Sequence, residues 1–198
     1  PHHNSKNSKC FNLNLTYKFL ATLEEFGDYS IKKEFYPNHE IIHKLRFAGT
    51  KGIPIPLISE SKITFNLSIP LLSLAAPKLN YKVCSLLCPE SASGEIYYKL
   101  GEKINSILQS SSDKAAMILP MNLSIYPEDK KDIDMNDQAI IETLINNNSK
   151  KNLSSIPSQT AKLLLLNEGI LGNTKHKFEK ISYEHTANIG FLTGMFNL

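Results

Sequence analysis

The chain is organised around residues 114–145, which read KAAMILPMNLSIYPEDKKDIDMNDQAIIETLI. Its apolar run at 115–121 predicts a buried strand, because short apolar runs bounded by turn residues are typical of such strands. After a polar loop, an amphipathic helix is expected to begin near Asp134. The buried face of this helix is formed by Ile140, Ile141, Leu144 and Ile145. In open α/β sheets, ligands bind at loops that follow the carboxyl ends of strands, so we expect any site after Met121.

Strands and helices alternate on both sides of this stretch. We expect strands at residues 11–15, 31–36, 81–87, 178–183 and 189–196. We expect helices to begin near residues 38, 93 and 158, and a short helix or turn at 67–74. A turn is predicted at Gly27-Asp28. The alternation predicts an α/β fold: a single domain with a mostly parallel central sheet, flanked by helices and completed by a C-terminal hairpin or edge pair.

Composition excludes several classes of protein. With 198 residues, of which 41% are hydrophobic, the chain can bury one sizeable core. The net charge of +3 is small and the lysines are scattered, which argues against a nucleic-acid surface. No run approaches 18 apolar residues, so we expect no membrane span. Three cysteines, an odd number in a chain of this size, predict a reducing cytoplasmic compartment. The oligomeric state is not indicated.

The order of motifs resembles the class III extradiol ring-cleavage dioxygenase superfamily, the LigB-like fold, in its AmmeMemoRadiSam and Memo-like branch. The C-terminal third carries the best match: KLLLLNEGILGN (162–173), then ISYEHTANIGF (181–191), is similar to the family's Leu-rich helix, Ser-Tyr-Glu-Gly-Pro segment and apolar strand. PMNLSI (120–125) stands where the family has Ser-Gly-Asp-Leu-Ser-His, and residues 26–55 follow its turn, strand, helix and Gly-Ile-Pro. The resemblance implies one LigB-like domain over residues 1–198, which lacks the family's first strand.

The resemblance also implies a metal site. Family enzymes hold non-haem Fe(II) with two histidines and a carboxylate, and a further histidine moves protons. Pro1, His2 and His3 are similar to the family's Ser-Pro-His, and Glu184 to its Ser-Tyr-Glu; His185 stands where the family has Gly. The candidate metal ligands are therefore His2, His3, Glu184 and His185. Residues 62–66, where another family histidine falls, hold no strong ligand, and Ile125 occupies the catalytic-base position, so no catalytic residue is assigned.

Each candidate also has a structural interpretation. His2 and His3 would be a flexible terminus, and Glu184 a solvated loop carboxylate. His39 and His43, four residues apart, could share a metal, but a surface pair is favoured because Ile42 and Leu45 mark the buried side of their helix. The spacing of Cys84 and Cys88 lacks a second ligand pair, which favours buried structural thiols.

Three functions compete. The first is an extradiol-type oxidoreductase that acts on a small aromatic ligand with Fe(II) or another divalent metal. The second is a non-catalytic, Memo-like binding or scaffold protein, which needs no cofactor and works beside an AmmeMemoRadiSam-type partner protein. The third is a metal-independent hydrolase or binding module of an unrelated class, which rests only on the fact that one fold hosts many functions. The joint loss of several site residues favours the second over the first.

Overall fold

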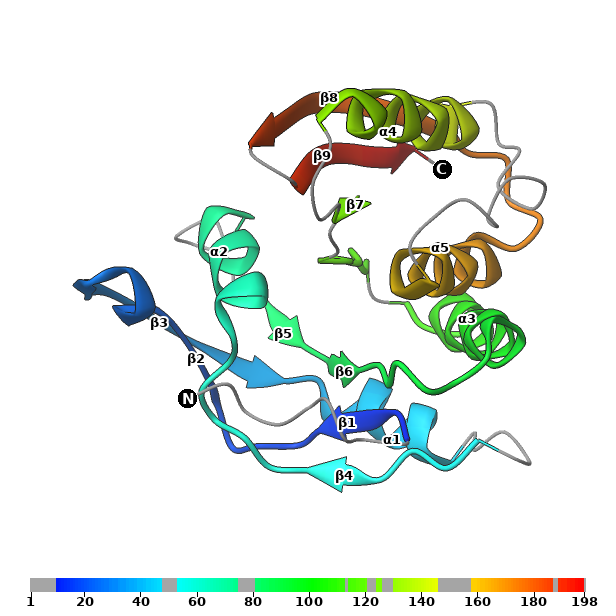
Figure 1. The fold of residues 1–198 in the computed structure, drawn as a ribbon. Coiled ribbons are helices and arrows are strands. Elements are labelled where there is room, and N and C mark those ends of the chain that lie inside the picture. Colours follow the sequence, from blue (N-terminus) through cyan, green and yellow to red (C-terminus); the bar gives the residue numbers. More distant parts are fainter. Residues whose placement is uncertain are drawn as a thin grey trace. The chain divides into compact units, whose positions relative to one another are not determined.

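The structure is a computed structural model that describes residues 10–47, 53–74, 81–112, 114–120, 124–125, 130–145, 158–186 and 189–197. Helices and strands alternate along the chain, so the predicted α/β class is confirmed (Figure 1). The chain divides into two compact units. Unit 1 comprises residues 1–92 and 107–120, and unit 2 comprises residues 93–106 and 121–198.

The first sheet of unit 1 is built around β1 (Asn12–Asn14). Parallel β4 (Leu57–Ile58) pairs with one edge of β1, and antiparallel β6 (Ser85–Leu87) pairs with the other. Leu13 is completely buried, as its alternation with polar neighbours predicts. The side chain of Asn14 donates to the Glu60 carbonyl at 2.8 Å and accepts from the Glu60 N–H at 3.0 Å. This amide thereby continues the β1–β4 pairing beyond the end of β4.

The second sheet of unit 1 has the strand order β2-β3-β5. An antiparallel hairpin joins β2 (Phe19–Leu23) to β3 (Asp28–Pro37), and β5 (Lys82–Val83) pairs with β3 in parallel. The hairpin turn consists of the 3-10 helix η2 (Glu24–Phe26) and Gly27, whose φ of 82° suits glycine because it has no Cβ. The predicted turn at this glycine is confirmed.

Two helices complete the described part of unit 1. Helix α1 (His39–Phe47) is capped by Asn38, whose Oδ1 accepts from the Ile41 N–H at 3.2 Å. Helix α2 (Phe65–Leu74) packs against β2 and contains Pro70, and it confirms the helical alternative at 67–74. The core beneath α2 consists of Phe19, Ala21, Phe35 and Ile63, with Leu67, Leu71, Leu72 and Val83 packed against them.

In unit 2, helix α4 (Lys130–Ile145) packs against an antiparallel sheet. The sheet order is β7-β9-β8, in which β9 (Ile189–Asn197) pairs with both β7 (Ser124–Ile125) and β8 (Lys177–Thr186). Their common core consists of Ile140, Ile141, Leu144, Ala161, Leu164 and Phe178. The predicted apolar stripe is therefore confirmed, except that Ile145 is 45% exposed.

Two further helices, α3 (Gly94–Gln109), which belongs to unit 2 as far as Ser106, and α5 (Ser158–Leu171), lie side by side (Figure 1). They touch through backbone atoms: a Cβ at Gly101 would lie 2.2 Å from the Leu166 carbonyl oxygen, and one at Gly169 would lie 2.2 Å from that of Tyr98. Only glycine permits this approach. Helix α5 ends at Leu171 and is followed by Gly172, whose φ of 56° is that of a glycine C-cap.

Four predictions about these elements are wrong. No strand forms at residues 114–120, and Met117 is 41% exposed, because none of the described strands pairs with this run. Helix α4 begins at Lys130, four residues before Asp134. Residues 81–87 form two strands, β5 and β6, in separate sheets, rather than one. Finally, antiparallel pairing dominates the described sheets, since the only parallel strand pairs in this part of the chain are β1–β4 and β3–β5.

Candidate functional site

The structure places two of the four predicted metal ligands. Glu184 lies within β8, opposite Phe191, and its side chain is exposed. His185 follows it in the same strand, opposite Gly190. The predicted loop around Glu184 is therefore wrong, because the β8–β9 pairing continues as far as Thr186. His2 and His3 lie outside the described residues.

The segment at 62–66, where the resemblance implies a family histidine, serves the core of unit 1. Ile63 is 6% exposed and belongs to the same cluster as Phe19 and Phe35. The residue before it, Lys62, forms an ion pair with Glu24, with 3.0 Å between Nζ and Oε2. Neither side chain can coordinate a metal in these roles.

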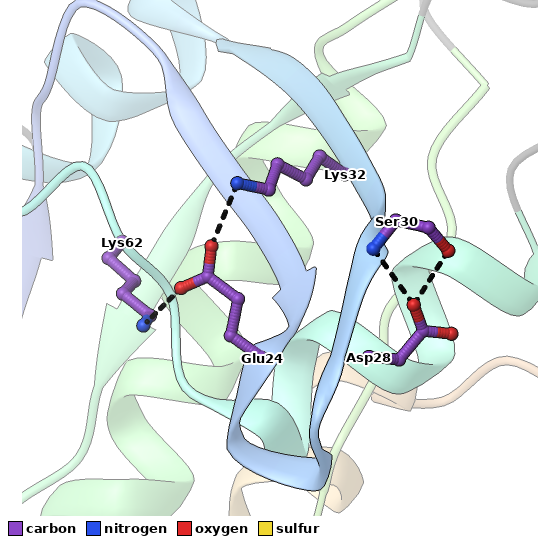
Figure 2. Close-up of polar contacts among 5 residues, drawn as sticks. All are labelled: Glu24, Asp28, Ser30, Lys32 and Lys62. Carbon is purple, nitrogen blue, oxygen red and sulfur yellow. Dashed lines mark hydrogen bonds and ion pairs between the residues drawn. The ribbon is translucent and has the colours of Figure 1, made fainter.

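Figure 2 shows the ionic contacts around this segment. The carboxylate of Glu24 lies between two ammonium groups, with Oε1 3.0 Å from Lys32 Nζ and Oε2 3.0 Å from Lys62 Nζ. These hydrogen bonds, from Lys32 first and then Lys62, lower the pKa of Glu24. At the hairpin turn, Asp28 Oδ1 accepts from the Ser30 N–H at 2.9 Å and from its hydroxyl at 2.7 Å, which lowers the Asp28 pKa. The contacts of Glu24 with Lys32 and of Asp28 with Ser30 lie within the β2–β3 hairpin, and the ion pair of Glu24 with Lys62 joins this hairpin to the chain before α2.

Three apolar side chains beside this network are exposed to solvent. Phe26 is 62% exposed and Phe65 is 42% exposed, and their rings meet edge to face with 5.8 Å between centroids. Ile69, one helical turn after Phe65, is 43% exposed. We call Phe26, Phe65 and Ile69 the aromatic patch. Contiguous exposed apolar side chains of this kind mark interaction surfaces.

A buried carboxylate that the sequence analysis missed joins α4 to β8. Asp137 is completely buried; its Oδ2 accepts from the Tyr183 hydroxyl at 2.9 Å, and its Oδ1 makes no hydrogen bond with the described residues. The burial of Asp137 could have been predicted from its spacing, since it lies three and four residues before Ile140 and Ile141 and therefore shares their face of the helix.

A small pocket lies among α4, α5 and β9. Its volume is about 20 Å³, which is room for one water-sized occupant. Four polar side chains line it, Thr143, Asn167, Glu168 and His176, together with four apolar ones. The His176 ring lies with Nδ1 2.8 Å from the Thr174 carbonyl oxygen. Spacing could not predict this set, because its members come from separate elements.

The remaining sequence candidates are structural. His39 and His43 are both exposed, and the His43 ring stacks on Phe47 at 6.1 Å, which confirms the surface pair. Burial raises the pKa of Cys84 and of Cys88 to about 12, as expected for structural thiols.

No protein-family model matches the chain, and no curated protein matches it. Among the described residues, no group of three or more His, Cys, Asp and Glu side chains is arranged to hold a metal. In the same part of the chain, no helix is both long and apolar enough to cross a membrane.

Proposed function

We propose that this chain is a divergent member of the LigB-like extradiol dioxygenase family that acts as a binding or scaffold protein rather than as a ring-opening oxidoreductase. The order of motifs along residues 26–55, 120–125, 162–173 and 181–191 supports membership. Helix α5 followed by the β8–β9 hairpin is the order that the resemblance implies for the C-terminal third.

The proposal depends most on residues 62–66, whose side chains pack in the core and form an ion pair. An extradiol site needs two histidines and a carboxylate around iron, with open positions for substrate and dioxygen. In this chain, Ile63 fills the core of unit 1 at the implied histidine segment, and Lys62 pairs with Glu24. A histidine at Ile63 would replace a core side chain with a polar ring, so this segment now supports the fold instead of a metal.

The position of Glu184 agrees with this proposal. The carboxylate is exposed on β8, and Ile125, at the implied catalytic-base position, pairs with Ile189 in the β7–β9 ladder. An isoleucine cannot transfer a proton. Exposure still leaves Glu184 accessible to Fe(II), and this keeps an extradiol-type activity on a small aromatic ligand as the second candidate function.

The aromatic patch supports the binding role. A protein partner would bury the Phe26 and Phe65 rings, and aromatic side chains of this kind dominate the energetics of protein interfaces. The ionic contacts of Glu24 with Lys32 and Lys62 supply a polar border. The resemblance names the class of partner, an AmmeMemoRadiSam-type protein.

The test is direct binding between the purified full chain and a purified partner of that class, measured by calorimetry. Phe65→Ser should weaken binding at least tenfold, because hot-spot aromatics contribute about 2 kcal/mol or more. Phe47→Ser is the matched control, since Phe47 is 78% exposed on α1. Binding that both variants weaken equally, or no binding by the unaltered chain, would contradict the proposed role.

A further inference from the structure

The pocket among α4, α5 and β9 brings together polar groups from separate elements of the chain. Glu168 contributes a carboxylate and His176 an imidazole, while Asn167, 4% exposed, and Thr143, 5% exposed, contribute an amide and a hydroxyl. The Thr143 hydroxyl donates to the Ala139 carbonyl at 2.7 Å, so its oxygen lone pairs remain as acceptors. The polar wall of the pocket therefore combines a carboxylate, an imidazole, an amide and a hydroxyl.

A hydrogen bond to the backbone sets the tautomer of His176. Its Nδ1 is 2.8 Å from the Thr174 carbonyl oxygen, which can only accept, so Nδ1 carries the proton and donates. Histidines that bind metals commonly donate one ring N–H to a carbonyl in this way, which directs the other nitrogen to the metal. The ring also meets Phe196 edge to face at 5.7 Å, and this contact fixes its plane.

We propose that this pocket binds one divalent transition-metal ion through His176 Nε2 and the Glu168 carboxylate, with the Asn167 side-chain oxygen or water completing the coordination. The volume of about 20 Å³ suits a single atom and excludes an organic ligand. Imidazole and carboxylate are preferred ligands of zinc and of its first-row neighbours. A metal here would link α5 to the start of β8, because Glu168 and Asn167 belong to α5 and His176 directly precedes β8.

The chain has only six histidines, which makes the test decisive. Its starting protein is the full chain with four histidines changed to Gln: His2, His3, His39 and His43. Zn²⁺ binding is measured by calorimetry, and coordination by the absorption bands of Co²⁺. We expect one ion per chain. Adding His176→Gln should weaken binding at least tenfold and remove the Co²⁺ bands, and Glu168→Gln should weaken it as well, while circular dichroism stays unchanged.

His185→Gln and Glu184→Ala distinguish this site from the family-type site. Binding that survives both changes and is lost with His176→Gln supports the pocket and leaves the proposed function untouched. Binding that instead depends on Glu184 or His185 would overturn the pocket assignment and would also argue against an eroded iron site. Absence of Zn²⁺ binding at millimolar concentration, or binding unchanged by His176→Gln, would mean that the pocket holds only water.

Discussion

Alanine at Gly101 should destabilise the protein, although alanine is the better helix former. In a helix interior without neighbours, replacing glycine by alanine stabilises by about 1 kcal/mol. Here the new Cβ would lie 2.2 Å from the Leu166 carbonyl oxygen and 2.9 Å from the Gly169 Cα. These are backbone atoms, which cannot rotate away as the end of a flexible side chain can. We therefore expect the extra Cβ to lower the free energy of unfolding by about 3 kcal/mol, the upper end of what overpacking costs. The net loss should be about 2 kcal/mol.

The assay is urea denaturation followed by far-ultraviolet circular dichroism. The control is Ser106→Ala, an exposed position on the same helix, which should change the free energy of unfolding by less than about 0.5 kcal/mol. Gly169→Ala should behave like Gly101→Ala, because its Cβ meets the Tyr98 carbonyl oxygen at 2.2 Å. A Gly101→Ala protein more stable than the unaltered chain would refute the close contact between α3 and α5.

Three further predictions concern other contacts. Tyr183→Phe should lower the free energy of unfolding by about 1–3 kcal/mol, because buried Asp137 loses its hydroxyl donor; equal stability in urea denaturation would contradict that contact. Because its pKa is lowered in the folded chain, the ionised Glu24 stabilises the fold at pH values above its unfolded-state pKa near 4.5. This stabilisation is lost as the pH falls through the folded-state pKa. Glu24→Gln should therefore destabilise at pH 7 and have no effect at strongly acidic pH, as thermal melts at both values would show. With a pKa of about 12 instead of 9.0, Cys84 and Cys88 carry about a thousandfold less thiolate at pH 8, so iodoacetamide should label them far more slowly in the native chain than in urea; equal rates would contradict their burial.

Much of the secondary structure follows from local patterns. The turn at Gly27 could be predicted because glycine readily adopts the positive φ that such turns need, and its φ is 82°. The stripe at Ile140, Ile141 and Leu144 predicts which face of α4 is buried. The apolar run at 115–121 predicts a strand that the structure lacks at 115–120, because apolar composition produces a strand only where another strand is available to pair with it.

The candidate sites depend on contacts between distant parts of the chain, which spacing does not encode. The pocket brings Glu168 and His176 together with residues of α4 and β9. The partner of Asp137 is 46 residues away in the chain. The resemblance directs attention to Glu184, but whether that carboxylate meets other ligands depends on how β8 pairs, and it lies exposed on that strand.

The most direct test of the proposed function is oxygen uptake by the full chain, loaded anaerobically with Fe(II) and supplied with a panel of simple catechols. If the proposed role is right, we expect no uptake above that of Fe(II) alone, because residues 62–66, where the resemblance implies a histidine, contain none, and Ile125 occupies the implied catalytic-base position. Sustained uptake with ring-opened product, abolished by Glu184→Ala and unaffected by His176→Gln, would contradict it and establish a working extradiol site.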